Sequence, residues 1–360
     1  MAGKKKWISR VRPEAVFCAT LSTLLFLPAY ALSQAPFYQG KTLTIIQGRR
    51  PGGTGDMRTR SVISHLSKYI PGNPSLVTQY MPGGGGRKAA NHIYNKARPD
   101  GLSIANIGAG FIANAVLGAP GVKYDIGKII YLGSGNSRSS YVFITRKEAG
   151  LDSLEKLRAA SGIRIGAQSV GHIVHYTARL FAWLLDLKEP KFVTGYSGRE
   201  VDLAVLRGEV DARANISYTI LQRSPEWIEK GLVHFHSIVE IPKGFRPRHP
   251  VFKRLPSLET FAKTDRERKV LEMYRITRLT GSPYIIPPGT PKKRVRILQE
   301  AFRKLFKDPE FSKTWRKLTG EEASPLLPEE IERALREIPR DPEVIRVFKK
   351  IAGAGPLPPR

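Results

Sequence analysis

The chain has 360 residues, more than a typical single domain, and this length suits two domains of about 100–200 residues each. Hydrophobic residues make up 41% of the sequence and charged residues 25%, a balance that supplies a packed core and excludes an intrinsically disordered chain. The formal net charge of +28 favours anionic partners, and the single cysteine, Cys18, excludes a disulfide scaffold or a cysteine metal site.

The first 35 residues have the pattern of a secretory signal. A basic segment precedes a stretch without charge, 15–27, which is too short to span a bilayer. Small residues alternate before Ala31 and before Ala35, as they do at cleavage sites. We expect residues 1–35 to be a signal peptide that is cleaved near Ala31 or Ala35 on export, and an uncleaved membrane anchor is the alternative.

After this signal, short strands alternate with glycine loops and helices. The segment 41–47 is rich in β-branched residues, and the glycine-rich segment 48–56 connects it to a helix. The same order repeats at once, with an extended segment at 76–80, a loop at 82–86, a helix and a third strand at 102–107. Strands that alternate with helices at this spacing predict right-handed crossovers and a parallel sheet.

The centre of the chain repeats this pattern. Its predicted elements are strands at 163–167, 191–194 and 210–216 and helices at 172–186 and 200–207. Together they indicate a second α/β layer. The segments 141–145 and 273–286 are predicted to be extended and to cross between the two layers, and from Pro291 onward apolar residues recur at helical spacing.

Two glycine loops in each layer follow a predicted strand and open a helix. Such loops present unpaired backbone N–H groups and the positive end of a helix dipole, and glycine lets a ligand approach closely. They therefore predict anion binding in a cleft between the layers, although glycines that only make sharp turns would give the same pattern. Arg49 and Arg50 lie in the first loop, and either side chain would clamp a carboxylate if it faced the cleft.

Nucleotides and nucleic acids are not expected as partners. Neither glycine loop of the first layer contains the Gly-x-x-x-x-Gly-Lys-Ser/Thr or the Gly-x-Gly-x-x-Gly pattern that nucleotide phosphates require. The basic residues are dispersed along the chain and accompany no nucleic-acid-binding motif.

A serine hydrolase is the main catalytic alternative. The segment 167–171 is similar to a nucleophile elbow around Ser169, and a triad would also need an acid and one of the later histidines, His234, His236 or His249. No pattern places any of these histidines against Ser169. We expect Ser169 instead to cap the following helix and to contact a ligand.

A metal site is a second alternative. His172 and His175 are three residues apart at a helix start, a spacing that metal ligands use, but the sequence offers no third ligand nearby. We expect both histidines to be neutral hydrogen-bonding groups, and we expect no metal and no cofactor.

Several of these segments resemble the exported substrate-binding proteins of tripartite tricarboxylate transporters, the Bug or TctC family, over residues of about 37–338. The matching motifs occur in order at Gly52–Asp56 with Arg60, Pro82–Gly83, Arg98–Gly101, Gly166–His175, Gly195–Gly198, Asp202–Leu203, Gly208–Asp211, Pro287–Pro291, Asp308–Pro309 and Pro328–Glu330.

The resemblance implies a two-lobed α/β fold, the type II periplasmic-binding-protein or Venus-flytrap fold, with a mostly parallel sheet flanked by helices in each lobe. Lobe I is expected to comprise 36–140 and 279–360, and lobe II 141–278. The implied function is that of a monomeric periplasmic solute-binding protein, not an enzyme. It would close on a small organic acid, a di- or tricarboxylate or an aromatic carboxylate, and deliver it to the membrane permease subunits of the transporter.

By position, the resemblance implies ligand contacts from both lobes. In lobe I these are Gly53, Thr54, Gly55, Asp56 and Gly84, and in lobe II Ser169, Gly171, Tyr196, Ser197, Gly198 and Asn215. Two further residues of the expected site depart from the family pattern. Arg49 lies where the family usually has Pro-Phe-Ala, and His172 stands where a serine is common. The added arginines predict a more anionic ligand.

Overall fold

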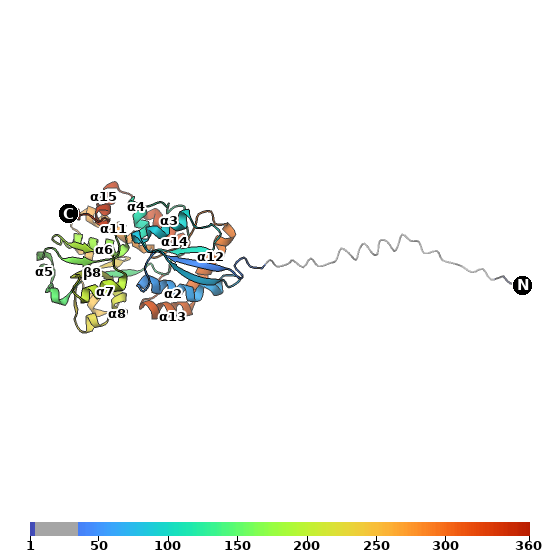
Figure 1. Ribbon diagram of the computed structural model, residues 1–360, viewed down its shortest axis with the longest axis horizontal. Helices are drawn as coiled ribbons and strands as arrows, with labels where there is room; N and C mark the ends of the chain where they lie inside the picture. Colours follow the sequence, from blue (N-terminus) through green and yellow to red (C-terminus); the bar gives the residue numbers. More distant parts are fainter. Residues whose placement is uncertain (4–34) are drawn as a thin grey trace. The chain divides into compact units, whose positions relative to one another are not determined.

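Two five-stranded sheets, each flanked by helices, organise the chain in the computed structural model (Figure 1). The structure describes residues 1–3 and 35–360, and Phe37–Arg360 forms one of its compact units. The predicted signal sequence therefore lies almost entirely outside the described residues. Within those residues, no helix combines the length and the apolar character that a membrane crossing requires.

The first sheet has the strand order β2-β1-β3-β10-β4. Its strands are Ser75–Tyr80 (β2), Thr42–Gln47 (β1), Ser103–Asn106 (β3), Tyr284–Ile286 (β10) and Ile130–Gly133 (β4). As predicted, β1 pairs in parallel with both β2 and β3. Strand β10 is antiparallel to β3 and to β4, so the sheet is mixed and not mostly parallel as the resemblance implied, and its parallel part carries the glycine loops.

The second sheet has the order β7-β6-β8-β5-β9 and the same mixed character. Its strands are Lys191–Val193 (β7), Arg164–Gly166 (β6), Ala212–Ile216 (β8), Ser139–Arg146 (β5) and Val233–Ile241 (β9). Strand β6 is parallel to β7 and β8, whereas β5 is antiparallel to β8 and β9. Each sheet thus contains a parallel half, in which strands predicted from the sequence alternate with helices.

Alternating side chains on the strands divide the core into layers. On β1, Leu43 and Ile45 face one layer of helices and Ile46 faces the other. The first layer consists of Thr54–Leu66 (α2), Lys292–Lys307 (α12) and Pro309–Thr319 (α13). The opposite layer contains Arg87–Asn95 (α3), Gly110–Val116 (α4) and Pro328–Glu337 (α14).

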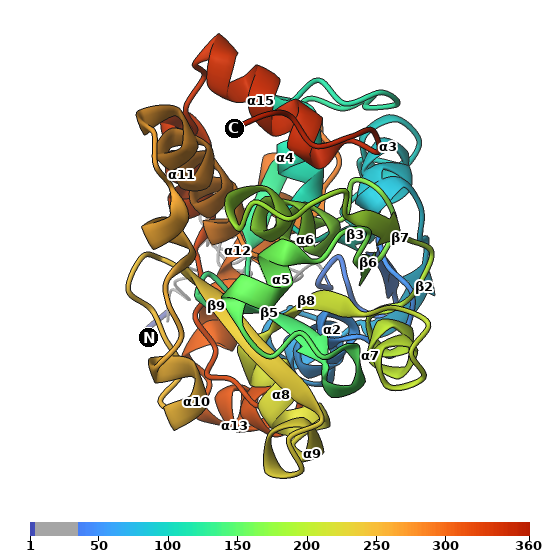
Figure 2. The same ribbon diagram turned by 90° about the vertical axis from the view of Figure 1, so that its left-hand side faces the viewer.

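The second sheet is covered in the same way, as Figure 2 shows. On β5, Val142 and Ile144 face one side of the sheet, while Tyr141 and Phe143 face the other. The first side is covered by Gly198–Leu206 (α7), Ser217–Arg223 (α8), Glu226–Glu229 (α9) and Pro250–Lys253 (α10). The other side is covered by Ile173–Leu184 (α6), Asp265–Leu279 (α11) and Pro342–Ala352 (α15), and Leu154–Ala159 (α5) adds Leu157 to this core.

One hydrophobic cluster extends from the first sheet to the second, through α4, α6, α11 and α15. The C-terminal helix α15 packs on α6 and α11, and the Arg179 guanidinium of α6 donates to the carbonyl of Gly355 at 2.7 Å. The lobe boundaries predicted above stay a prediction. Helix α15 belongs to lobe I in that prediction, yet it packs on α6 and α11, which lie within 141–278 except for Leu279.

The two predicted crossing segments differ from the structure. Residues 141–145 lie wholly within β5, and the chain passes between the sheets just before it, where Ser134 and Asn136 form bridges with 324–326. The extended structure predicted for Met273–Leu279 is wrong, because α11 continues to Leu279. A capping box of Thr264 and Glu267 starts this helix well before the segment that was predicted to be extended.

Candidate ligand-binding site

A cavity of about 290 Å³ lies between the two sheets. Its walls are the segments that follow β1, β2 and β3 in the first sheet and β6, β7 and β8 in the second. Loops at the carboxyl ends of parallel strands are the usual ligand sites of open α/β sheets. The glycine loops predicted from the sequence therefore lie at the ends of the parallel strands of both sheets, and they face each other across the cavity.

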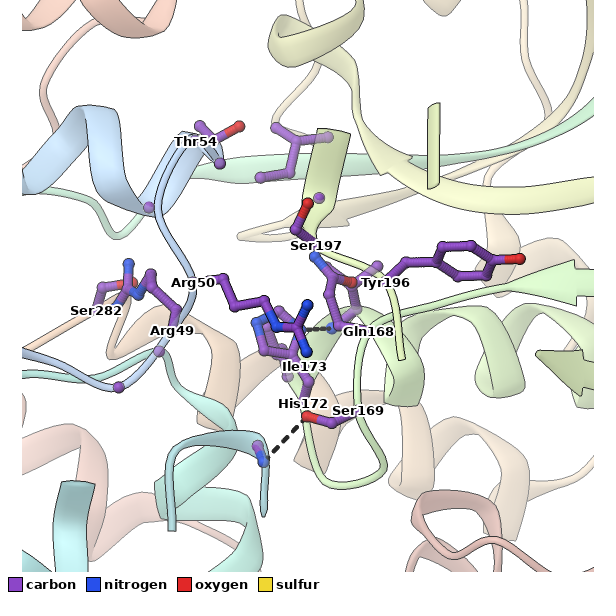
Figure 3. A pocket seen from close by; sticks show the side chains of 18 of the residues that line it. Arg49, Arg50, Thr54, Gln168, Ser169, His172, Ile173, Tyr196, Ser197 and Ser282 are labelled. Atoms are coloured by element: carbon purple, nitrogen blue, oxygen red, sulfur yellow. Dashed lines mark hydrogen bonds between the residues drawn. The ribbon is translucent and has the colours of Figure 1, made fainter. Parts of the chain in front are cut away.

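Ten of the thirteen residues expected at the site line this cavity, several of them labelled in Figure 3: Arg49, Gly53, Thr54, Gly55, Ser169, His172, Tyr196, Ser197, Gly198 and Asn215. The other three, Asp56, Gly84 and Gly171, are not among its lining residues.

Asp56 lies beneath the first loop and organises it. Its carboxylate is fully buried and accepts hydrogen bonds from the Gly52 backbone N–H at 2.9 Å, the Gln47 amide at 2.8 Å and the Tyr80 hydroxyl at 2.8 Å. Arg60 adds an ion pair. Burial alone would raise the pKa of Asp56, but these hydrogen bonds and the Arg60 charge outweigh it and hold the pKa below its ordinary value. Asp56 is therefore an ionised anchor for the backbone of the loop.

Gly84 and Gly171 belong to the place where the two glycine loops touch. Gly85 takes a left-handed φ of 65°, and a side chain there would collide with the Gly171 backbone. The Gly85 N–H also donates to the Ser169 hydroxyl oxygen at 3.2 Å, a contact drawn in Figure 3. Buried Asn114 completes this junction by donating to the Gly171 carbonyl at 3.1 Å. The glycines here allow close approach between the loops.

Several lining side chains of the second sheet are engaged in holding their own loops. Ser197 caps α7 and forms a capping box with Glu200. The Asn215 amide donates to Asp202 at 3.1 Å, while its carbonyl oxygen accepts from the Ile216 N–H. The Tyr196 ring extends away from Arg50 in Figure 3. These side chains therefore hold the loops that form this wall of the cavity.

Six arginines line the cavity, and no aspartate or glutamate does: Arg49, Arg50, Arg58, Arg213, Arg223 and Arg278. Arg58 pairs with Glu321, its Nε 2.6 Å from the carboxylate, and Arg213 pairs with Asp202. Across residues 35–360, the other four form no salt bridge. Burial lowers the pKa of Arg49 to about 10, which leaves its guanidinium charged at neutral pH. The cavity is a strongly cationic environment.

Four of these six arginines were not identified from the sequence, although the sequence positions of two of them could have indicated the site. Arg58 follows Thr54 by one helical turn on α2, and Arg213 alternates with Asn215 on β8, so each shares a face with a predicted site residue. Arg278 gave no signal, because its segment was interpreted as extended.

His172 and His175 have separate structural roles. His172 caps α6, with its Nδ1 accepting the Val174 N–H at 3.2 Å, so the neutral ring carries its proton on Nε2. Burial, with the charges of Arg49 and Arg278 adding to it, lowers the pKa of His172 to about 3. His175 is buried beside Tyr176 and Phe192. In the described part of the chain, no three histidine, cysteine, aspartate or glutamate residues form a group that could hold a metal ion.

The residues of the hydrolase alternative are dispersed. The Ser169 hydroxyl accepts a hydrogen bond from the Gly85 N–H, and the prediction that it caps the following helix is wrong, because His172 is the cap of α6. His236 bonds to the Thr145 hydroxyl at 2.8 Å, and His249 caps α10 through its Nδ1. His234 is paired with Thr145 in the β5–β9 register. Ser169 accordingly has none of these histidines as a hydrogen-bonded base among the residues described.

The two mixed sheets, the flanking helices and the cavity between them define a two-lobed α/β periplasmic-binding-protein fold. The periplasmic binding protein BugD has this fold with a TM-score of 0.66 at 19% identity, over 88% of this chain and 99% of that one. MatC from Rhodopseudomonas palustris with bound malate matches with a TM-score of 0.64 at 18% identity, over 87% and 99% of the two chains. A second R. palustris protein, solved with adipate, has the same TM-score and identity over 87% and 97%.

These structural matches confirm the fold that the Bug and TctC resemblance predicted. No protein-family model matches the chain, and no curated protein matches it in sequence.

Proposed function

We propose that this protein is an exported solute-binding protein of the Bug or TctC type that captures an organic carboxylate in the cavity between its sheets. The observation that carries this proposal is the composition of the cavity wall, which holds six arginines and no acidic side chain. Arginine forks match carboxylate geometry, and a low-dielectric cavity strengthens their interaction with an anion. The malate and adipate bound by two proteins of the same fold support this class of ligand.

The loops add neutral donors to these cations. The first loop is held by Asp56, so its backbone has a defined shape before any ligand arrives. Thr54 lies across from Thr219, their hydroxyl oxygens 3.0 Å apart, which joins the wall of the first sheet to that of the second. Contacts of this kind are suited to closure of two lobes around a ligand.

A thermal-shift screen tests the proposed ligand class. The exported protein is unfolded and refolded to remove carried-over ligand, then heated with mono-, di-, tri- and aromatic carboxylates beside their amides. A ligand at 100 times its dissociation constant stabilises the fold by about 2.7 kcal/mol, which is readily measured. We expect a selective acid to raise the melting temperature while its amide does not. Equal shifts with acid and amide would contradict the proposal.

Export and delivery to a permease are the finer parts of the proposal. They rest on the signal-like segment 1–35 and on the Bug and TctC resemblance. We expect the full chain, expressed in a bacterium, to be found in the periplasm as a monomer. Its mass should be that of a chain that starts at Leu32 or Pro36. A full-length protein held in the membrane fraction would support the uncleaved anchor instead. Loss of uptake of the captured acid on deletion of the gene would support delivery to a transporter.

A further inference from the structure

The six arginines of the cavity differ in how their charge is compensated. Arg58 and Arg213 are neutralised by Glu321 and Asp202. Arg50 is exposed, and half-buried Arg223 donates to the Gly52 carbonyl at 3.2 Å. The remaining two, Arg49 and Arg278, place guanidinium nitrogens out of solvent and form no salt bridge in the part of the chain described. These two are the unusual ones, because buried charges are ordinarily paired.

Arg49 is held in place by packing and leaves one nitrogen without a partner. Its guanidinium occupies the space above Gly55, where any side chain would collide with it. Its Nη2 is buried and has no hydrogen-bond partner among the described residues. A buried guanidinium nitrogen without an acceptor is costly, and a bound anion would remove that cost.

Arg278 is held by hydrogen bonds from its guanidinium to neighbouring side chains. Only 2% of the residue is exposed, its Nε donates to the Tyr141 hydroxyl at 2.7 Å, and its Nη2 donates to Ser139 at 3.2 Å. The guanidinium carbon is 5.4 Å from the centroid of the Tyr141 ring, which adds a cation–π contact. These contacts orient the group without neutralising its charge, and both Arg278 and Tyr141 line the cavity.

We propose that Arg49 and Arg278 form a direct oxyanion subsite in the buried wall of the cavity, which binds one negatively charged group of the ligand through guanidinium N–H donors. The inference rests on the proposed function, because the ligand must first enter this cavity. It goes further by assigning the charged group to two side chains from separate segments, the loop after β1 and the end of α11. The neutral Nε2–H of His172, a lining residue, supplies an additional donor.

The chemistry of the subsite fits a planar carboxylate or a tetrahedral phosphoryl oxyanion, since guanidinium forks recognise both. The test therefore includes both sources. Malate, adipate and inorganic phosphate are titrated calorimetrically at constant ionic strength into refolded wild-type protein, Arg49→Gln and Arg278→Gln. The control is Arg333→Gln, which removes one exposed positive charge from α14, outside the cavity.

We expect Arg49→Gln to weaken binding of the recognised anion at least tenfold and Arg333→Gln to change it less than twofold. The ligand-free melting temperature of Arg49→Gln should equal or exceed that of wild type, because an uncompensated buried charge is removed. An arginine with a purely structural role would lower it. Arg278→Gln should weaken binding similarly, with some loss of stability from the broken Tyr141 and Ser139 contacts.

The outcomes separate this inference from the proposed function. A carboxylate that binds wild type and Arg49→Gln within twofold would overturn the subsite and leave the carboxylate-binding function standing. Phosphate binding that is lost in Arg49→Gln, with no acid of the carboxylate screen bound, would support the subsite and overturn the carboxylate function. If neither phosphate nor any acid of the screen binds the wild-type protein, both are overturned.

Discussion

Replacement of Asp56 by alanine tests how the first glycine loop is held in shape. The carboxylate is fully buried and accepts bonds from a backbone N–H, an amide and a hydroxyl. The substitution leaves the buried Gln47 amide without its acceptor, removes the charge-assisted bond from Gly52 and breaks the Arg60 ion pair. Removing one partner of such a buried charged network costs about 3–5 kcal/mol. We expect the free energy of unfolding to fall by this amount.

Asp152→Ala is the matched control. Asp152 also pairs with a cation four residues away, Lys156, at 2.8 Å, but both side chains are about half exposed. An exposed pair of this kind contributes about 0.5 kcal/mol or less. Urea unfolding, followed by circular dichroism, compares the two variants with wild type.

Ligand titration then separates the two roles that Asp56 could have. If Asp56 anchors the loop, Asp56→Ala loses stability and affinity together. A variant that unfolds like Asp152→Ala would refute the reasoning, and loss of affinity at unchanged stability would restore the direct ligand contact that the sequence predicted.

Three further predictions concern the glycine junction, Ser169 and the buried histidines. Gly85→Ala should weaken ligand binding at least tenfold, because its side chain would meet the Gly171 backbone; Gly118→Ala, also at positive φ but in open space, is the control, and equal effects would contradict the packing argument. Ser169→Ala removes the acceptor of the Gly85 N–H and should weaken carboxylate binding severalfold without changing ester hydrolysis, whereas a lost esterase rate would support a hydrolase. Burial lowers the pKa of His172 and His175 to about 3 and of His236 to about 4, so all three stay neutral when folded and gain protons only on unfolding as the pH falls below 6.5. The free energy of unfolding should therefore drop by about 4 kcal/mol between pH 7.5 and 5.5, and pH-independent urea midpoints would refute this.

Much of the fold could be predicted because the decisive signals are local. Strands such as 41–47 and 163–167 are short runs with β-branched residues and a glycine near their ends, and their observed counterparts β1 and β6 agree within one or two residues. The helix at 172–186 is visible from its apolar content and is observed as α6. Local signals failed for 273–279, where the buried residues of α11, among them Met273, Tyr274 and Thr277, pack as one helix face.

The candidate site was harder to predict than the fold, because its chemistry depends on distant pairings. Glycine loops could be found from composition, but whether an arginine is neutralised depends on partners such as Glu321, which is 263 residues from Arg58. The role of Asp56 could not be predicted for the same reason. Its motif predicts proximity to the ligand, whereas only the structure shows that its oxygens are occupied by Gly52, Gln47 and Tyr80.

The central claim is that the cavity recognises an anion. A calorimetric titration of the refolded protein with the best acid of the screen, beside its fully methylated ester, tests this claim most directly because the two molecules differ in charge and little else. The account predicts one acid bound per chain, with the ester bound at least a hundredfold more weakly. An ester that binds as tightly as its acid would show that the arginines do not recognise the negative charge of the ligand, and would contradict the account.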